Sequence, residues 1–292
     1  MEPTHSFGPV RFISLNVRYA TKTLVPGEEP WSVRCPKLCA QLKFITMGNS
    51  NVFICLQEVL HTQLVDIQAY LGPSWSHIGH GRDDGQQAGE FSPIFYQAKH
   101  WRCERDKTYW LSPTPDVPSV GWDAALKRVV TVGSFHHKIS GTIVIGMSTH
   151  LDHRGEVARE ESAKLLLKLA REWGKNDSGD EQNFLMLGGD MNSTPSEGAY
   201  KVLTAPGSGV DDISTVVPEE LKYGNRDVTY TSFGEPDEEP KTIDFLFAKQ
   251  SNTLRFLTFG ILPNQFDDKV YLSDHRPVVA DIEVIMTPTG LN

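Results

Sequence analysis

The sequence predicts an α/β fold in which two mixed sheets pack against each other and helices cover their outer faces. Short apolar runs typical of strands alternate with segments whose apolar residues recur at helical spacing. The pair Ser140-Gly141 separates two strand-like runs and indicates a hairpin, so some neighbouring strands pair antiparallel. Several of these runs end in a carboxylate, an amide or a histidine, as expected if strand ends from both sheets meet along one edge.

The strand-like runs, in chain order, are VRFISLNV, NVFICLQ, SPIFYQ, RVVTVGSFHHKI, GTIVIGMSTHL, FLMLGG, TIDFLF and PVVADIEV. Helical spacing predicts helices over 36–48, 63–71, 156–173 and 196–203. The helix over 156–173 has the clearest pattern, because Leu165, Leu166, Leu169 and Trp173 fall on one face. The polar stretch 175–182 is predicted to be a loop.

Three segments have the composition of linkers, namely 81–89, 112–119 and 233–241. Each is short and lies between predicted strands, so we interpret them as loops over an active site rather than as domain boundaries. No internal repeat is visible. The sequence therefore predicts one domain over residues 1–292.

The chain carries a formal net charge of −9. A surface built for a nucleic-acid backbone normally needs a stripe of lysine and arginine, which this balance disfavours. Arg82, Arg128 and Arg154 nevertheless lie near candidate site residues and can form a local basic pocket. This combination favours a small phosphorylated substrate, with nucleic acid as the less favoured partner.

The four cysteines are Cys35, Cys39, Cys55 and Cys103. No second cysteine or histidine pair follows Cys35 and Cys39 at zinc-site spacing, so we expect free thiols, with Cys55 buried in its strand. The first residues lack the pattern of a secretory signal, and no apolar run has transmembrane length. We expect a cytoplasmic monomer that does not associate with membranes.

Glu58 and Asn16 each follow an apolar run. A carboxylate at the end of a buried strand is costly without a partner, and a metal ion supplies one. The alternative is that Glu58 caps the following helix and that Asn16 marks a turn.

The segment Gly188-Gly189-Asp190-Met191-Asn192 also ends a strand-like run. Alternate residues of an extended chain project to the same side, which predicts that Asp190 and Asn192 converge on one ligand. A carboxylate beside an amide is suited to orienting a water molecule and binding a phosphoryl oxygen. The same pattern alone also describes many turns.

Asp274 and His275 precede the last strand, and Asp244 lies within the apolar run TIDFLF. Burying Asp244 is costly unless a cationic group pairs with it. We therefore predict a dyad of Asp244 and His275, in which the carboxylate orients the imidazole and stabilises its protonated form. The alternative for His275 alone is a core or surface histidine without a role in a site.

His150 ends another strand-like run and is followed by Asp152, His153 and Arg154. Alternation predicts that His150, Asp152 and Arg154 point to one side. A zinc site is the competing interpretation, but this spacing matches no closed zinc site.

Taken in order, these motifs resemble those of the endonuclease/exonuclease/phosphatase superfamily of metal-dependent phosphoesterases. The resemblance spans about residues 11–285 and implies a four-layer α/β/β/α sandwich with the site at one edge. It implies Mg²⁺ or Mn²⁺ held by Asn16, Glu58 and Asp274, and catalytic roles for His150, Asp190, Asn192, Asp244 and His275. Strings such as GRDDG and THLDHRGEVAR resemble a bacterial and fungal subgroup of the superfamily.

The resemblance also implies substrate contacts. Glu90 stands where some members carry a carboxylate that supports the histidine equivalent to His150, and Arg128 is placed like a phosphate-contacting arginine. Asp152, Arg82 and Arg154 lie nearby in the sequence, and Trp110 and Trp122 are candidates for stacking on a sugar or base, with core packing as their alternative.

Three functions remain open at this point. The first is a metal-dependent phosphoesterase acting on a small phosphodiester or phosphomonoester that carries a sugar or nucleotide. The second is a nuclease acting on DNA or RNA. The third, a noncatalytic binding module, is disfavoured because every expected catalytic position is filled.

Overall fold

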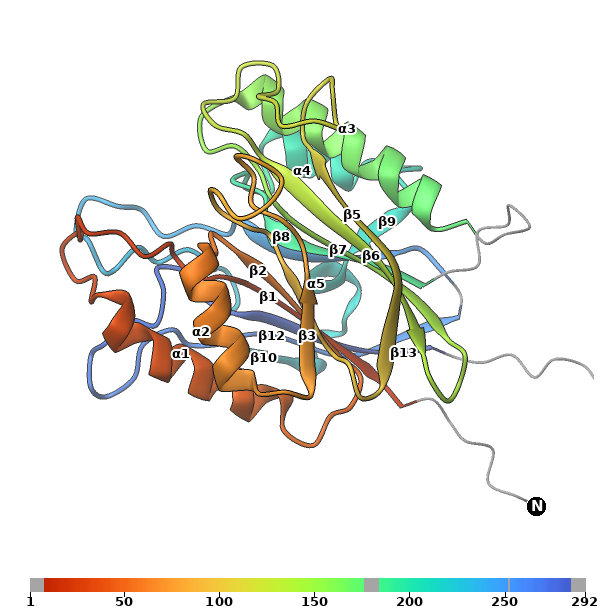
Figure 1. The fold of residues 1–292 in the computed structure, drawn as a ribbon, viewed down its shortest axis with the longest axis horizontal. Helices are drawn as coiled ribbons and strands as arrows, with labels where there is room; N and C mark the ends of the chain where they lie inside the picture. The colour runs from red at the N-terminus through yellow and green to blue at the C-terminus, as the bar shows by residue number, and fades with distance from the viewer. Residues whose placement is uncertain (1–7, 176–183, 252, 285–292) are drawn as a thin grey trace, which may run out of the picture.

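The computed structural model describes residues 8–175, 184–251 and 253–284, and it has four layers in the order helix, sheet, sheet, helix (Figure 1). The two sheets pack face to face in the middle, as predicted. Helices α1 (Trp31–Thr46) and α2 (His61–Leu71) cover the outer face of one sheet, and α3 (Glu156–Trp173) and α4 (Gly198–Leu203) cover that of the other.

The first sheet has seven strands in the spatial order β10 (Lys222–Gly224), β12 (Leu254–Ile261), β13 (Val278–Val284), β1 (Val10–Asn16), β2 (Val52–Gln57), β4 (Ile94–Gln97) and β3 (Trp75–Ile78). The second has six strands in the order β5 (Trp101–Trp110), β6 (Val129–His137), β7 (Ile143–His150), β8 (Phe184–Asp190), β11 (Asp244–Lys249) and β9 (Val210–Asp212). Both sheets mix parallel and antiparallel pairs. The short elements α5 (Ile213–Val216) and the 3₁₀ helix Glu219–Leu221 connect β9 to β10.

The strands next to the sheet interface follow the two-residue period of extended chain. In β1, Val10 and Phe12 face the other sheet, whereas Ile13 and Leu15 face the helices. In β2 the same division separates Phe53 from its neighbours. Continuing this alternation places the last residue of β1, Asn16, on the side that faces the second sheet.

An aromatic cluster occupies the centre of the interface between the sheets. Phe53 of β2 is fully buried, and its ring centroid lies 4.9 Å from those of Trp101 and Phe135 of the second sheet. Phe12 of β1 lies beside it at 6.2 Å. Gly188 of β8 keeps the sheets in close contact, because a Cβ there would lie 3.2 Å from the Phe12 ring.

Most predicted elements are present, with boundary differences at the helices. The helix over Glu156–Trp173 has the predicted limits. Helix α1 begins at Trp31 rather than at residue 36, because Pro36 lies inside the helix instead of starting it. The predicted loop 175–182 lies, apart from Lys175, outside the described residues.

Two long strands, β5 and β12, were not predicted. Strand β5 is an edge strand of its sheet and its exposed residues are mostly charged, so it forms no apolar run. Strand β12 lies between β10 and β13, and its apolar residues are interrupted by the exposed Arg255 and Thr258. Their alternation is also interrupted by irregular pairing, between Cys103 and Arg105 in β5 and between Phe256 and Thr258 in β12.

The cysteines are free thiols, and three of them, Cys35, Cys39 and Cys55, are buried. The first two lie one helical turn apart in α1 with their sulfur atoms 4.0 Å from each other. Within the described part of the chain, no helix has the length and apolar character needed to cross a bilayer.

Replacing Phe53 with alanine should lower the free energy of unfolding by about 3–5 kcal/mol, because the substitution opens a cavity between the sheets. Phe44→Ala is the control, since the Phe44 side chain is 83% exposed, and it should change the free energy by less than about 0.5 kcal/mol. Urea unfolding followed by tryptophan fluorescence measures both values. Equal values for the two variants would contradict the assignment of Phe53 to the central core.

Candidate active site

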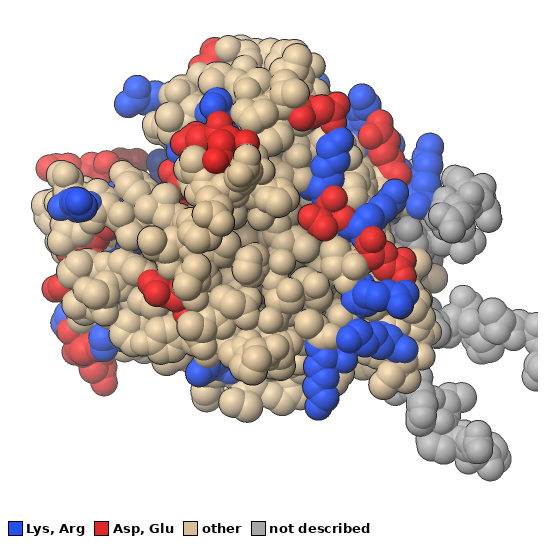
Figure 2. All heavy atoms as spheres, viewed as in Figure 1, with Lys and Arg blue, Asp and Glu red and all other residues tan. Residues whose placement is uncertain are grey.

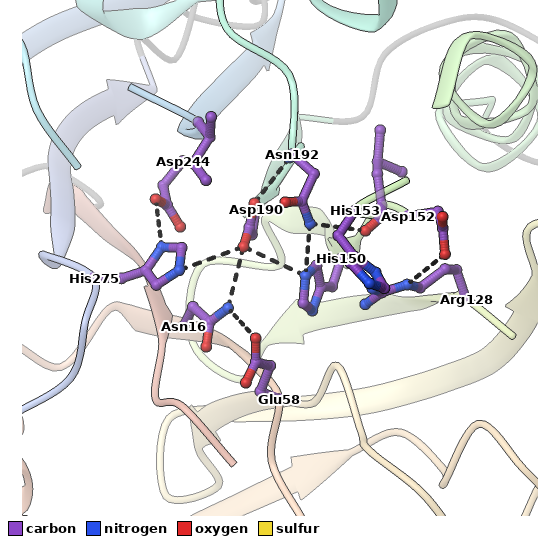
Figure 3. Close-up of polar contacts among 12 residues, drawn as sticks. Asn16, Glu58, Arg128, His150, Asp152, His153, Asp190, Asn192, Asp244 and His275 are labelled. Atoms are coloured by element: carbon purple, nitrogen blue, oxygen red, sulfur yellow. Dashed lines mark hydrogen bonds and ion pairs between the residues drawn. The ribbon is translucent and has the colours of Figure 1, made fainter. Parts of the chain in front are cut away.

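Four side chains from the ends of neighbouring strands meet at one edge of the sandwich (Figure 3). In the second sheet, Asp190 at the end of β8 pairs in register with His150 at the end of β7 and with Asp244 at the start of β11. Asn16, at the end of β1, reaches Asp190 from the first sheet, with 3.1 Å between its Nδ2 and Asp190 Oδ2. Strand register therefore fixes the spacing of these groups.

His275 and Asp244 form the dyad expected from the sequence. Their Nδ1 and Oδ2 atoms lie 2.8 Å apart, and both side chains are buried. Burial by itself lowers the pKa of His275, but the Asp244 carboxylate, followed by Asp190 and Asp274, outweighs it and raises the pKa to about 10. The ring is therefore an imidazolium at neutral pH, and the edge of the Tyr230 ring packs on it with centroids 5.0 Å apart.

Asp190 is the centre of the hydrogen-bond network. Its Oδ2 faces Asn16 and lies 3.4 Å from His150 Nε2 and 3.7 Å from His275 Nε2, while its Oδ1 accepts the backbone N–H of Asn192 at 2.8 Å. Burial and the nearby Asp244 charge raise the pKa of Asp190 above the usual range of an aspartate. Such a carboxylate is a better proton acceptor than an ordinary aspartate.

Asn192 reaches the site through a turn. Its φ is +44°, so the chain is not extended here, and the convergence of Asp190 and Asn192 does not come from strand alternation as we expected. The side chain of Asn192 donates to Leu151 O at 3.0 Å and lies 2.9 Å from His150 Nε2. Asn192 therefore orients His150.

His150 is neutral in this environment. Burial, and then the positive charges of Arg128 and Arg82, hold the pKa of His150 well below its usual value. Because the amide nitrogen of Asn192 faces Nε2, the ring carries its proton on Nδ1. That buried Nδ1 makes no hydrogen bond with any described residue.

Glu58 and Asp274 form a pair of carboxylates on the side of the pocket nearest the first sheet. Glu58 has a φ of +60°, an unusual conformation for a residue of this kind. Its Oε1 accepts from Asn16 Nδ2 at 3.0 Å and its Oε2 from the backbone N–H of Tyr19 at 3.1 Å. After burial, the negative charge of Glu58 is the main cause that raises the pKa of Asp274, so the two carboxylates repel each other.

This donor set fits a hard divalent cation, because the half-buried Glu58 and the buried Asp274 supply oxygen ligands and gain from a positive charge between them. Asn16, which we expected among the metal ligands, bridges several of these groups. Its oxygen accepts the backbone N–H of Arg18 at 2.9 Å, and its nitrogen faces Glu58 and Asp190. In this arrangement Asn16 links the carboxylates of Glu58 and Asp190.

A second group, formed by Asp190, Asp244 and His275, also brings possible ligand atoms within 4.8 Å of one another. Its charges are already compensated, because the His275 imidazolium lies between the two carboxylates. A metal ion there would have to displace the proton that joins His275 to Asp244. Glu58 and Asp274 are therefore the better candidate metal ligands.

Arginines form the opposite wall of the pocket. Arg82 makes a two-pronged ion pair with Glu90, with distances of 2.7 and 2.8 Å. Arg128 is 5% exposed; its Nη2 lies 3.1 Å from His153 Nδ1, and its Nη1 is buried with no partner among the described residues. A buried guanidinium donor without an acceptor favours an anionic or hydroxyl-bearing ligand at this wall.

Several expected substrate contacts are corrected by the structure. Glu90 pairs with Arg82 instead of supporting His150. Asp152 is buried and accepts four backbone N–H groups, so it shapes the turn after β7. Arg154 is exposed and does not line the pocket, because strand alternation stops where β7 ends at His150.

The two tryptophans also lie outside the pocket lining. Trp110 is 6% exposed at the end of β5. Its Nε1 donates to Arg82 O at 2.8 Å, and this hydrogen bond anchors the loop 81–89. Trp122 is partly exposed in the following loop. The core-packing alternative is correct for Trp110, and neither ring is placed for stacking on a ligand in this pocket.

The pocket that contains these groups has a volume of about 660 Å³, within the range of small-molecule sites. Sequence reasoning did not assign five of the polar residues that line it, namely Arg18, Tyr19, His153, Tyr230 and Lys241. All five lie in loops, where no periodic pattern marks them. Loops 81–89 and 233–241 contribute Arg82 and Lys241 as expected of loops over the site, whereas loop 112–119 contributes no lining residue.

No protein-family model and no curated protein matches the sequence. Several solved structures match this chain. An endonuclease/exonuclease/phosphatase from Bacteroides vulgatus is 31% identical with a TM-score of 0.81, and the match covers 94% of this chain and 99% of that one. A protein of the same family from Bacteroides thetaiotaomicron is 28% identical, with a TM-score of 0.82 over 95% of this chain and 98% of the other.

A mannosyl-6-phosphatase from Bacteroides thetaiotaomicron is 27% identical to this chain, with a TM-score of 0.80 and coverage of 94% and 99%. These similarities extend over nearly the whole of each chain and agree with the four-layer fold and the polar edge described above. The protein therefore belongs to the endonuclease/exonuclease/phosphatase superfamily.

Proposed function

We propose that this protein is a divalent-metal-dependent phosphoesterase that hydrolyses a small phosphomonoester or phosphodiester carrying a sugar or nucleotide. One observation carries the proposal. A pair of carboxylates suited to a hard cation, a raised-pKa aspartate and a histidine held by the buried Asp244 carboxylate all lie at one pocket. Hydrolysis of a phosphate ester needs these three functions, namely charge neutralisation, activation of water and stabilisation of the transition state.

In the proposed mechanism, Glu58 and Asp274 hold Mg²⁺ or Mn²⁺. The bound ion would neutralise negative charge on the phosphoryl oxygens. Asp190 orients the attacking water and accepts its proton, a role that its raised pKa supports. His275, held as imidazolium by Asp244, donates a hydrogen bond to the phosphoryl group.

His150 and Arg128 also line the pocket and supply further polar contacts to the phosphoryl group, while Asn192 holds the His150 ring in place. The Nδ1 atom of His150 and the Nη1 atom of Arg128 have no hydrogen-bond partner among the described residues. Because these groups are buried and already oriented, little reorganisation is needed as charge develops in the transition state.

A small substrate is favoured over a nucleic acid. The pocket holds about 660 Å³, and the chain has a net charge of −9. On the face drawn in Figure 2, basic and acidic side chains are interspersed and form no continuous basic stripe. The relative described as a mannosyl-6-phosphatase supports a phosphorylated sugar as the first class to test. A nuclease is the second candidate, and a noncatalytic binding module is disfavoured because the catalytic positions are filled.

Glu58→Gln should reduce the rate of ester hydrolysis by at least about a hundredfold, because the amide removes one negative charge from the carboxylate pair. The matched control is Glu172→Gln, at an exposed position of α3, which should leave the rate unchanged. Rates are measured with para-nitrophenyl phosphate and bis-para-nitrophenyl phosphate in Mg²⁺ or Mn²⁺ and in excess chelator. Full activity of the wild type in chelator would refute a metal-dependent mechanism.

His275→Ala and His150→Ala should each lower turnover by about a hundredfold or more, with little change in KM, because each removes a donor to the developing charge. His100→Ala is the control, since His100 does not line the pocket. Steady-state kinetics separates the two parameters. If one of the site variants changed only KM, that histidine would be a binding contact with no role in the transition state.

Small phosphate esters should be hydrolysed faster than duplex DNA, with a shallow dependence on salt, because a small anion releases few counterions on binding. Activity is compared on a hexose 6-phosphate, a nucleoside monophosphate, a single-stranded oligonucleotide and a duplex, between low and physiological salt. The Glu58→Gln variant, carried through the same purification, controls for contaminating nucleases. Efficient cleavage of long DNA or RNA with steep salt dependence would favour the nuclease function instead.

A further inference from the structure

Arg34 is a fully buried arginine in helix α1 that lies outside the pocket lining. Its guanidinium donates to four backbone carbonyls. The Nε atom bonds Glu29 O at 2.9 Å, Nη1 bonds Val17 O at 2.8 Å and Leu272 O at 2.9 Å, and Nη2 bonds Arg18 O at 3.1 Å. The Glu28 carboxylate lies 3.9 Å from Nη2 and balances its charge.

Three of these carbonyls belong to two segments next to the candidate metal ligands, since one contacts Glu58 and the other carries Asp274. Val17 and Arg18 directly follow Asn16, and Leu272 precedes Ser273-Asp274. These segments are more than 250 residues apart in sequence, and Arg34 Nη1 bonds both of them. Ser273 Oγ adds a direct link by donating to Asn16 O at 2.6 Å.

The turn held by Arg34 also sets the position of Glu58. The next residue along the chain, Tyr19, donates its backbone N–H to Glu58 Oε2 at 3.1 Å, and Arg18 donates its own to Asn16 Oδ1. Arg18 has a φ of +58°, a conformation that persists in a residue other than glycine only when its surroundings enforce it. The bonds from Arg34 to the carbonyls on both sides of Arg18 provide that enforcement.

The positive charge of Arg34 also affects the two candidate metal ligands. Glu58 and Asp274 are both among the groups whose charges act on the Arg34 guanidinium. A permanent positive charge beneath the carboxylate pair offsets part of their mutual repulsion. Arginine suits this role better than lysine because its planar fork can satisfy several carbonyls in fixed directions, whereas an ammonium group is a single point of attachment.

We propose that Arg34 is a positioning residue for the divalent cation, which holds the Val17–Arg18 turn and the segment before Asp274 at the spacing that lets Glu58 and Asp274 bind one ion. This inference rests on the proposed metal-dependent function. It assigns Arg34 no contact with substrate or metal.

The test measures Mn²⁺ affinity directly, by electron paramagnetic resonance of free Mn²⁺ and by calorimetry, on the full chain without substrate. Arg34→Lys keeps the charge but loses the fork, and its affinity for Mn²⁺ should fall about 10–100-fold, the range found for residues that orient metal ligands. Circular dichroism and thermal unfolding establish that the variant is folded at the temperature of the titration.

Arg11→Lys is the matched control. Arg11 also joins β1 to α1, because its side chain donates to Ile45 O and pairs with Asp281, but it lies at the opposite end of β1 from Asn16. This variant should bind Mn²⁺ within about twofold of wild type, even if its melting temperature falls by a similar amount. Glu28→Gln is a second test, since it removes the carboxylate that pairs with both Arg34 and Arg18 and should give a smaller, intermediate loss of affinity.

The outcomes separate this inference from the proposed function. If the wild type binds Mn²⁺ and Arg34→Lys and Glu28→Gln bind it equally well, Arg34 has no positioning role, and the proposed function stands. If Arg11→Lys loses as much affinity as Arg34→Lys, the effect is general destabilisation, and the inference is wrong. If the wild type itself binds no Mn²⁺, the metal-dependent function and the inference both fail.

Discussion

The compensation of charge at the edge of the sandwich is the constraint on which the rest of the structure depends. The interior between the sheets is apolar, yet four carboxylates, Glu58, Asp190, Asp244 and Asp274, are largely removed from solvent at one end of it. Each such charge is costly unless a proton, a cation or several donors face it. The positive charge of the His275 imidazolium compensates the negative charges of Asp190 and Asp244.

The other two carboxylates are compensated only in part by the protein. The positive charges of Arg18, in a loop, and of Arg34, in helix α1, act on Glu58 and Asp274. The site therefore has two parts. In the part around His275 the charges are balanced, whereas the part around Glu58 and Asp274 favours binding of a further cation. In the proposed mechanism, the first part serves proton transfer and the second part would hold the metal ion.

The sequence predicts the parts of this arrangement that follow from periodic burial. The fold class, most strands and the dyad of Asp244 and His275 follow because an aspartate within an apolar strand needs a partner. Arg154 and Trp110 lie outside the pocket lining, because alternation holds only within a strand and because tertiary packing decides which aromatic rings are covered. Arg18, Tyr230 and Lys241 could not be found, since long-range contacts, not local pattern, bring their loops to the pocket.

The in-register contact of His150, Asp190 and Asp244 has a consequence for how this protein can change over generations. Inserting or deleting one residue in β7, β8 or β11 would turn a reactive group away from the pocket, so these strands are closed to changes in length. Loops 81–89 and 233–241, which supply Arg82 and Lys241, carry no such restriction. Changes in these loops can therefore alter which substrates bind, while the reactive groups on the strands keep their positions.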